Sequence, residues 1–205
     1  LKSKDEEKSK YQKDKETQRG LLVNLKQEET KLKDDLQDHE ERKRKLSRAI
    51  RQAIEREIAA QSKTTTSKGF GSTPEAKLQG KNFAANQGRL PWPVLKGEIT
   101  GKFGKHAHAV IRGVYTQNNG VDISTAKGAT MRCVFAGKVS SVFVIPGAGK
   151  AVMVSHGNYR TVYANLKEIY VSKGDQLSAK QEVGVILPSE KGSISEAHFE
   201  IWKIS

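Results

Sequence analysis

The sequence predicts an α+β protein in which a long, charged helix precedes a mainly antiparallel β domain. Residues 1–62 contain no proline and a single glycine, so little in them interrupts a helix. From residue 91 onward, short runs of β-branched and aromatic residues alternate with turn residues. No helical pattern of about 10–15 residues separates these runs, and the strands are therefore expected to pair antiparallel.

The segment 1–62 is expected to form one helix of roughly 90 Å, at about 1.5 Å per residue. Its apolar residues recur at steps of four, seven and ten, which places them on one stripe: Leu25, Leu32, Leu36, Leu46, Ile50, Ile54 and Ile58. Because the stripe is narrow, we expect the helix to pack against one other helix as a coiled coil.

Residues 63–90 are predicted to be a linker or regulatory arm, because they are rich in Ser, Thr, Gly and Asn. The run Ser-Thr-Pro-Glu at 72–75 is a helix-start signal. It predicts a short helix over about 74–79 that ends at Gly80. A mostly mobile tether is the alternative. Two apolar side chains here are candidates for docking on a neighbouring surface: Leu78 and Phe83.

Residues 91–205 are predicted to form the β domain. At about 115 residues this part of the chain is long enough to hold its own core. Its clearest strand candidates are separated by the turns at 146–149 and 157–158, and they cover 138–145, 151–156 and 159–166.

The formal net charge of +13 is unevenly distributed. Residues 1–60 hold 17 Lys and Arg against 14 Asp and Glu, whereas residues 61–205 hold 19 against 9. The excess therefore lies in the β domain, where the basic residues are scattered rather than grouped with aromatic ones. This pattern argues against a nucleic-acid partner.

The composition excludes two further classes of protein. Cys133 is the only cysteine, which excludes an intrachain disulfide framework and a CxxC zinc site. No apolar run approaches the roughly 18 residues of a membrane span. The chain opens without a hydrophobic signal region or an initiator Met, so we expect a fragment whose targeting segment was removed.

Asp122 and His198 are the residues most suited to metal chemistry. Asp122 follows the turn Asn118-Asn119-Gly120, and His198 lies in an alternating run that places Glu196, His198 and Glu200 on one side. A zinc hydrolase needs about three N or O ligands, an open position for water and a general base. These two residues supply two ligands, and the spacing does not fix a third.

From Leu90 on, the chain resembles the LytM-type domains of the M23 family of zinc peptidases, which cut peptidoglycan cross-bridges. The resemblance is carried by short matching runs over the whole β domain: 103–104 (FG), 120–123 (GVDI), 137–139 (GKV), 152–157 (VMVSHG), 162–166 (VYANL), 174–175 (GD) and 198–201 (HFEI).

The resemblance implies a role for each family position, and several positions have changed. The zinc-binding His and Asp of HxxxD correspond to Asn118 and Asp122. The catalytic His of Tyr-x-His-Leu corresponds to Asn165. In the closing HxH, the assisting His is Glu196 and the zinc-binding His is His198. Two ligand positions remain, and neither catalytic histidine does.

These changes predict a domain that is not an enzyme and holds no metal or other cofactor. A carboxamide is a poor zinc ligand beside imidazole, and Asn165 cannot carry a proton near neutral pH. An alternative is a zinc metalloendopeptidase that cleaves peptidoglycan cross-bridges, with Glu196 as third ligand beside Asp122 and His198. His106 and His108 are expected at a pocket rim or in core contacts, and His156 is expected to be structural.

Within this family the chain resembles the EnvC-type murein hydrolase activators, which join a long coiled coil to a degenerate LytM domain through a flexible arm. The runs LPWPVLKGEITGKFG at 90–104 and HFEIWK at 198–203 strengthen this resemblance. It implies a periplasmic protein that activates N-acetylmuramoyl-L-alanine amidases in cell division and daughter-cell separation. It also implies a coiled coil that contacts an ABC-transporter-like cell-division complex, and a helix that can cover the binding groove.

We therefore expect the amidase to bind in the former active-site groove. Eight residues are predicted to line the groove: Asn118, Asp122, Asn165, Glu196, His198, Tyr115, Tyr163 and Trp202. The last three are aromatic and are candidate anchors for the partner.

A third alternative is a passive binder of peptidoglycan, because a net charge of +10 in the β domain suits a polyanionic cell wall.

Overall fold

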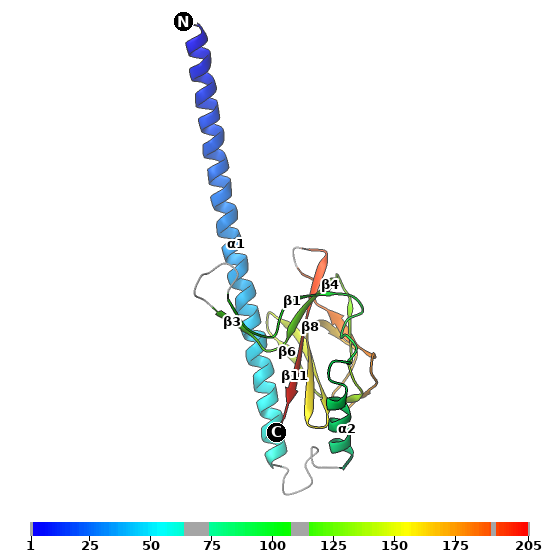
Figure 1. Cartoon of the computed structure of the whole chain (residues 1–205). Helices are drawn as coiled ribbons and strands as arrows, with labels where there is room; N and C mark the ends of the chain where they lie inside the picture. Colours follow the sequence, from blue (N-terminus) through cyan, green and yellow to red (C-terminus); the bar gives the residue numbers. More distant parts are fainter. Residues whose placement is uncertain (1, 64–73, 108–114, 190–191, 205) are drawn as a thin grey trace. The chain divides into compact units, whose positions relative to one another are not determined.

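The structure is a computed structural model that describes residues 2–63, 74–107, 115–189 and 192–204 (Figure 1). Two helices come first, α1 (Lys2–Lys63) and α2 (Pro74–Ala85). The strands follow in the order β1 (Glu98–Gly101), β2 (Gly104–Ala107), β3 (Tyr115–Asn118), β4 (Val121–Ala126), β5 (Thr130–Arg132), β6 (Gly137–Ile145), β7 (Gly149–His156), β8 (Tyr159–Ile169), β9 (Gln176–Leu177), β10 (Glu182–Ile186) and β11 (Ile194–Lys203). The predicted α+β class is confirmed.

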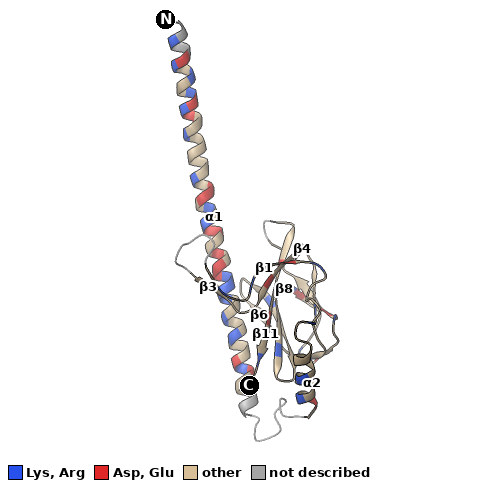
Figure 2. Ribbon diagram, viewed as in Figure 1, with Lys and Arg blue, Asp and Glu red and all other residues tan. Residues whose placement is uncertain are grey.

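The chain divides into two compact units, Leu1–Arg44 and Lys45–Ser205. In the first unit, Lys, Arg, Asp and Glu are interspersed along α1 (Figure 2), and Leu22, Leu25 and Leu32 are exposed. A helix with this surface has little apolar area to bury within its own unit, so pairing with another helix stays our prediction for it. Among the described residues, no helix has the length and apolar character needed to cross a membrane.

The second unit is built on one antiparallel sheet with the order β1-β4-β11-β8-β7-β6-β9. Strand β10 pairs with β5 and β8, and β2 and β3 form a separate two-stranded sheet. Every strand pair in the described residues is antiparallel, as the sequence predicts. The strand β11 lies between β4 and β8, which places the sequence-distant segments around Asp122 and Ala164 on either side of His198.

Both faces of this sheet are buried. Because side chains alternate along a strand, Val152 and Val154 of β7 enter one core, while Ala151 and Met153 enter the other. The first core also contains Phe83 of α2, and we call its side of the sheet the α2 face. The second core is closed by α1, and we call its side the α1 face.

The end of α1 covers the α1 face through three aliphatic residues on one stripe. Leu46, Ile50 and Ile54 are buried there, with Ile50 completely inaccessible. This part of the predicted coiled-coil stripe therefore packs on the sheet rather than on a second helix. The predicted boundary at residue 62 follows the end of the helix, whereas the compact unit begins at Lys45.

Helix α2 docks on the opposite face through Phe83, whose ring stacks on His156 with centroids 4.8 Å apart. The helix runs through Gly80 to Ala85, so the predicted end at Gly80 is wrong. Gly80 serves close packing instead, because a Cβ there would collide with the side chain of Asn158. Of the two docking candidates, Phe83 is buried and Leu78 is exposed.

The single cysteine lies deep in the core of the α2 face. Cys133 is 1% exposed, and its Sγ contacts the Phe135 carbonyl oxygen at 3.0 Å. Burial raises the pKa of this thiol above its ordinary value. The side chain is therefore an inert part of the packing.

Candidate functional site

The candidate site lies on the α1 face, where β4 and β11 run side by side. Their register places His198 directly opposite Asp122, and both side chains point to this face. Gly101 of β1 lies against Asp122 so closely that a Cβ would collide with the carboxylate. Backbone pairing thus fixes Asp122 and His198, to which the family resemblance assigns zinc binding, next to each other.

His198 is held between two carboxylates. Its Nδ1 donates to Asp122 Oδ1 at 2.6 Å and its Nε2 donates to Glu200 Oε1 at 2.9 Å. Burial lowers the pKa of His198, but the hydrogen bonds and charges of Asp122 and Glu200 outweigh it and raise that pKa to about 9. Near neutral pH the ring is therefore an imidazolium that donates from both nitrogens.

Trp202 completes this arrangement from the next inward position of β11. Its indole Nε1 donates to Glu200 Oε2 at 2.6 Å, so both oxygens of Glu200 are engaged. The ring also packs against the apolar cluster that contains Ile50. Trp202 therefore links the polar site to the packing of α1.

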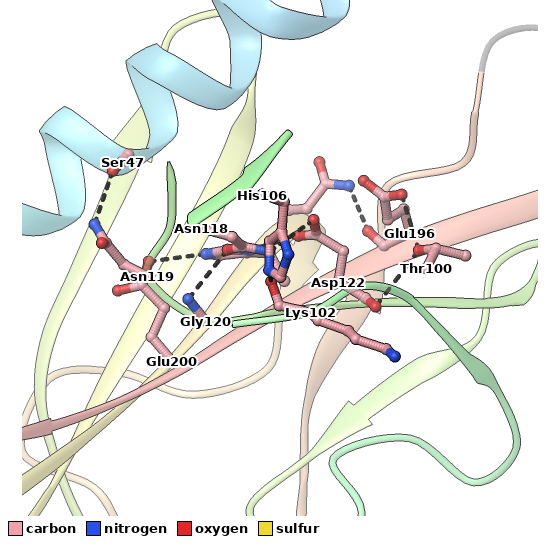
Figure 3. Close-up of polar contacts among 12 residues, drawn as sticks. Ser47, Thr100, Lys102, His106, Asn118, Asn119, Gly120, Asp122, Glu196 and Glu200 are labelled. Carbon is pink, nitrogen blue, oxygen red and sulfur yellow. Dashed lines mark hydrogen bonds and ion pairs between the residues drawn. The ribbon is translucent and has the colours of Figure 1, made fainter. Parts of the chain in front are cut away.

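Asn118 forms a tight turn at the end of β3. Its Oδ1 accepts from Gly120 N, and its Nδ2 donates to Asp122 Oδ2, each at 3.1 Å (Figure 3). The neighbouring Asn119 donates from Nδ2 to Ser47 Oγ of α1 at 3.1 Å. The side chain of Asn118 thus orients Asp122, and that of Asn119 contacts α1.

Asn165 and Glu196 lie at the two positions to which the family resemblance assigns catalytic histidines. Asn165 has a φ of 62°, and its Nδ2 donates to the Glu196 carbonyl oxygen at 2.5 Å. Glu196 Oε2 accepts from Thr100 Oγ1 of β1 at 3.3 Å. Both side chains therefore make contacts that fix β8, β11 and β1 to one another.

These residues form an incomplete zinc site. Asp122 faces Nδ1 of His198, and Glu200 accepts from Nε2, where a carboxylate commonly orients a metal-bound His. Asp122 and His198 therefore supply two ligands, and a third is missing. Asn118 points an N–H donor at Asp122, whereas a ligand must present a lone pair. In the described part of the chain, no three His, Cys, Asp or Glu side chains are arranged to hold a metal.

The predicted aromatic anchors are placed differently from one another. Tyr163 is wrong as a groove residue: it is fully buried in the core of the α2 face, and its hydroxyl accepts from Val134 N at 2.9 Å. Tyr115 is exposed on β3, where the Lys105 ammonium lies 4.6 Å from its ring centroid. Trp202 lies on the α1 face, and its role as an anchor stays a prediction.

Among the residues that the structure describes, His156 and His106 take no part in this site. The buried ring of His156 bonds the Ala136 carbonyl oxygen and Thr161 Oγ1, which fits the structural role expected of it. His106 donates from Nε2 to the Lys102 carbonyl oxygen at 2.9 Å and is exposed. His108 lies outside the described residues.

Two features of the site were missed at the level of sequence. Glu200 was placed on the correct side of its strand but given no role, although its spacing of two from His198 is the available signal. The contacts of Ser47 and Glu57 of α1 with the β domain carry no local signal, because they join residues more than 70 positions apart.

Part of the chain is similar to known proteins. Residues 116–205 match Peptidase family M23. The chain is 39% identical over 105 residues to the uncharacterized protein NMB1333 of Neisseria meningitidis serogroup B, covering 50% of this chain and 16% of that protein. It is 29% identical over 113 residues to the peptidoglycan DD-endopeptidase ShyB of Vibrio cholerae, covering 54% and 26% respectively.

Solved structures are similar to part of the chain. A zinc-containing peptidase from Vibrio cholerae is 31% identical with a TM-score of 0.48, over 55% of this chain and 36% of that one. A chain of the SpoIIIAH–SpoIIQ complex is 26% identical with a TM-score of 0.46, over 56% and 92%.

The β domain is similar to the M23 peptidase domains over residues 116–205. The chain spans only 16% and 26% of the curated relatives that it matches.

Proposed function

We propose that this protein is a non-catalytic activator of N-acetylmuramoyl-L-alanine amidases, acting on peptidoglycan in cell division and daughter-cell separation. The observation that carries the proposal is that Asn118 points its Nδ2 donor at Asp122 Oδ2, at 3.1 Å, and so presents no lone pair to a metal beside Asp122 and His198. A site with two ligands lacks the third that a zinc hydrolase needs to hold the metal and activate a water. The surrounding fold is nevertheless preserved, which favours a role for this face in binding.

The proposed amidase-binding surface is the α1 face around Asn118, Asp122 and Trp202. The buried stripe of Leu46, Ile50 and Ile54 covers part of that face. An amidase and this stripe would compete for it, so binding requires the stripe to leave. A partner that prefers the uncovered state shifts the population toward it.

The same proposal gives the N-terminal part of α1 a role in control. We propose that it contacts an ABC-transporter-like cell-division complex in the periplasm and transmits the signal that uncovers the α1 face. The exposed Leu22, Leu25 and Leu32 supply apolar contact positions on this helix.

The test is an amidase assay on peptidoglycan with the full chain added. Ile50→Asp places a charge in the buried stripe and is expected to stimulate cleavage more strongly than the wild type does. Arg51→Asp, on the exposed neighbouring position, is the matched control and is expected to behave like the wild type. No stimulation by any of the three proteins would refute the activator.

A second assay locates the binding surface. In the Ile50→Asp background, Trp202→Ala and Asn118→Asp are expected to lower stimulation. Unchanged stimulation by both variants would refute this location of the amidase-binding surface.

The similarity to a named peptidoglycan endopeptidase favours one alternative, a zinc metalloendopeptidase. Metal analysis of the purified protein separates the two functions. We expect less than stoichiometric zinc and no cross-bridge cleavage. Stoichiometric zinc, with cleavage abolished by His198→Ala, would establish the enzyme instead.

A further inference from the structure

The α1 face has a polar end, distinct from the His198 site, which is centred on Arg160 of β8. Arg160 is only 1% exposed. Its register partner on β7 is Ser155, and the two side chains therefore share the α1 face. Ser140, at the bulge of β6, contacts the same residue of α1 as Arg160 does, namely Glu57.

Arg160 is positioned by the β domain itself. Its Nη1 donates to the carbonyl oxygens of Gly157 and Tyr159, at 2.6 and 2.9 Å. Gly157 in turn packs against Gly80 of α2, which braces the turn that carries these carbonyl groups. The guanidinium is thus held in place by contacts that do not involve α1.

The carboxylate of Glu57, on α1, binds to Arg160 and Ser140 at this end of the α1 face. Its Oε1 accepts from Arg160 Nε at 2.5 Å, and its Oε2 accepts from Ser140 Oγ at 3.0 Å. A buried guanidinium without a counter-charge is strongly destabilising. A group that replaces α1 here must therefore bring an anion.

Glu57 does not satisfy every buried hydrogen-bonding group at this end of the α1 face. The hydroxyl of Ser155 is buried and has no hydrogen-bond partner among the described residues. Burying an unpaired hydroxyl costs free energy that a better-placed acceptor would recover. The site therefore has one more buried donor than Glu57 uses.

We infer that Arg160, Ser140 and Ser155 form a carboxylate-binding subsite, which Glu57 occupies in the covered state and an acidic side chain of the partner occupies in the bound state. The second half rests on the proposed function. The occupant we expect is an amphipathic helix of the amidase. It carries aliphatic residues with the spacing of Leu46, Ile50 and Ile54, followed by an Asp or Glu about one turn further on.

The direct test uses a labelled peptide of residues 45–63 and the full chain carrying Ile50→Asp, with affinity measured by fluorescence anisotropy. The wild-type peptide is expected to bind. The same peptide with Glu57→Gln is expected to bind at least about tenfold more weakly, because it loses a buried charged hydrogen bond. The Glu55→Gln peptide removes one exposed charge and is expected to bind like the wild type.

These peptide substitutions leave the folded protein unchanged, so misfolding cannot explain the result. Equal affinity of the Glu57→Gln and wild-type peptides overturns the subsite, and so does the absence of any binding by the wild-type peptide.

The amidase assay separates the subsite from the proposed function. Arg160→Gln, added to the Ile50→Asp chain and checked for folding by circular dichroism, is expected to weaken stimulation, with Arg160→Lys retaining more. If the wild-type and Glu57→Gln peptides differ in affinity but no amidase is stimulated, the subsite is supported and the activator function is refuted. If Arg160→Gln leaves stimulation unchanged in a folded protein, the activator function is supported, and the binding of a partner carboxylate at the subsite is refuted.

Discussion

Two buried histidines of the β domain are held in opposite charge states by their surroundings. His198 lies between Asp122 and Glu200, which stabilise its imidazolium. His156 instead hydrogen-bonds the Ala136 carbonyl oxygen and Thr161 Oγ1, and burial lowers its pKa to about 4. The two rings therefore affect stability in opposite directions: His198 destabilises the fold when the pH rises, and His156 does so when the pH falls.

At alkaline pH, His198 is expected to destabilise the fold as it loses its proton. Its pKa rises from 6.5 to about 9 on folding, so its contribution is fully present below pH 6.5 and is lost as the pH rises through 9. The thermal midpoint of the wild type should fall across this window. That of His198→Gln should be lower at pH 6.5 and nearly flat, and parallel curves for the two proteins would contradict the assignment.

At acid pH, the neutral His156 is expected to limit stability. Its pKa falls from 6.5 to about 4 on folding, so its contribution is complete above pH 6.5 and is lost as the pH falls toward 4. The full effect is about 3 kcal/mol. Urea unfolding at pH 6.5 and pH 4 should show a smaller loss in His156→Gln than in the wild type. The exposed His39→Gln is the control and should lose as much as the wild type.

At the scale of elements, one helix packs on each face of the sheet. The end of α1 is fixed by an aliphatic stripe and by Glu57, whereas α2 is fixed by an aromatic ring and two glycines. The first contact is broad and contains an ion pair, while the second depends on the close approach of two backbones. The two helices should therefore respond to different substitutions.

Shortening the central residue of the α1 stripe is expected to loosen that helix. Ile50→Ala should cost about 2–5 kcal/mol, because the side chain is fully buried and leaves a cavity. Hydrogen exchange should accelerate for the amides of residues 45–58. Arg51→Ala, at an exposed position of the same helix, should leave both stability and exchange nearly unchanged.

Adding a methyl group at the second contact is expected to displace α2. Gly157 has a φ of +75°, and a Cβ there would collide with the Ala76 carbonyl oxygen and lie 2.7 Å from Gly80 N. Gly147 has a φ of +77° but nothing within 4 Å, so Gly147→Ala carries the backbone strain alone, about 1 kcal/mol. Gly157→Ala should be markedly less stable than this control and should expose Phe83 to solvent. Equal stability of the two variants would contradict the docking.

At the scale of the whole molecule, local pattern predicted the fold class and the antiparallel pairing, because strand alternation is visible in the sequence. Pairing between distant strands was not visible. Tyr163 was assigned to the groove, yet the register that places Ala164 beside His198 turns Tyr163 to the other face. An aliphatic stripe such as Leu46 to Ile54 also looks the same whether a helix or a sheet covers it.

The deep burial of Cys133 has a practical consequence for measuring these motions. An inert native thiol leaves the chain free of competing reaction sites, so introduced cysteines can be labelled selectively. Glu55 on α1 and Val144 on β6 are both exposed, and a pair of spin labels there would report their separation. A broadened distance distribution on addition of an amidase would show the uncovered state directly, without the Ile50→Asp substitution.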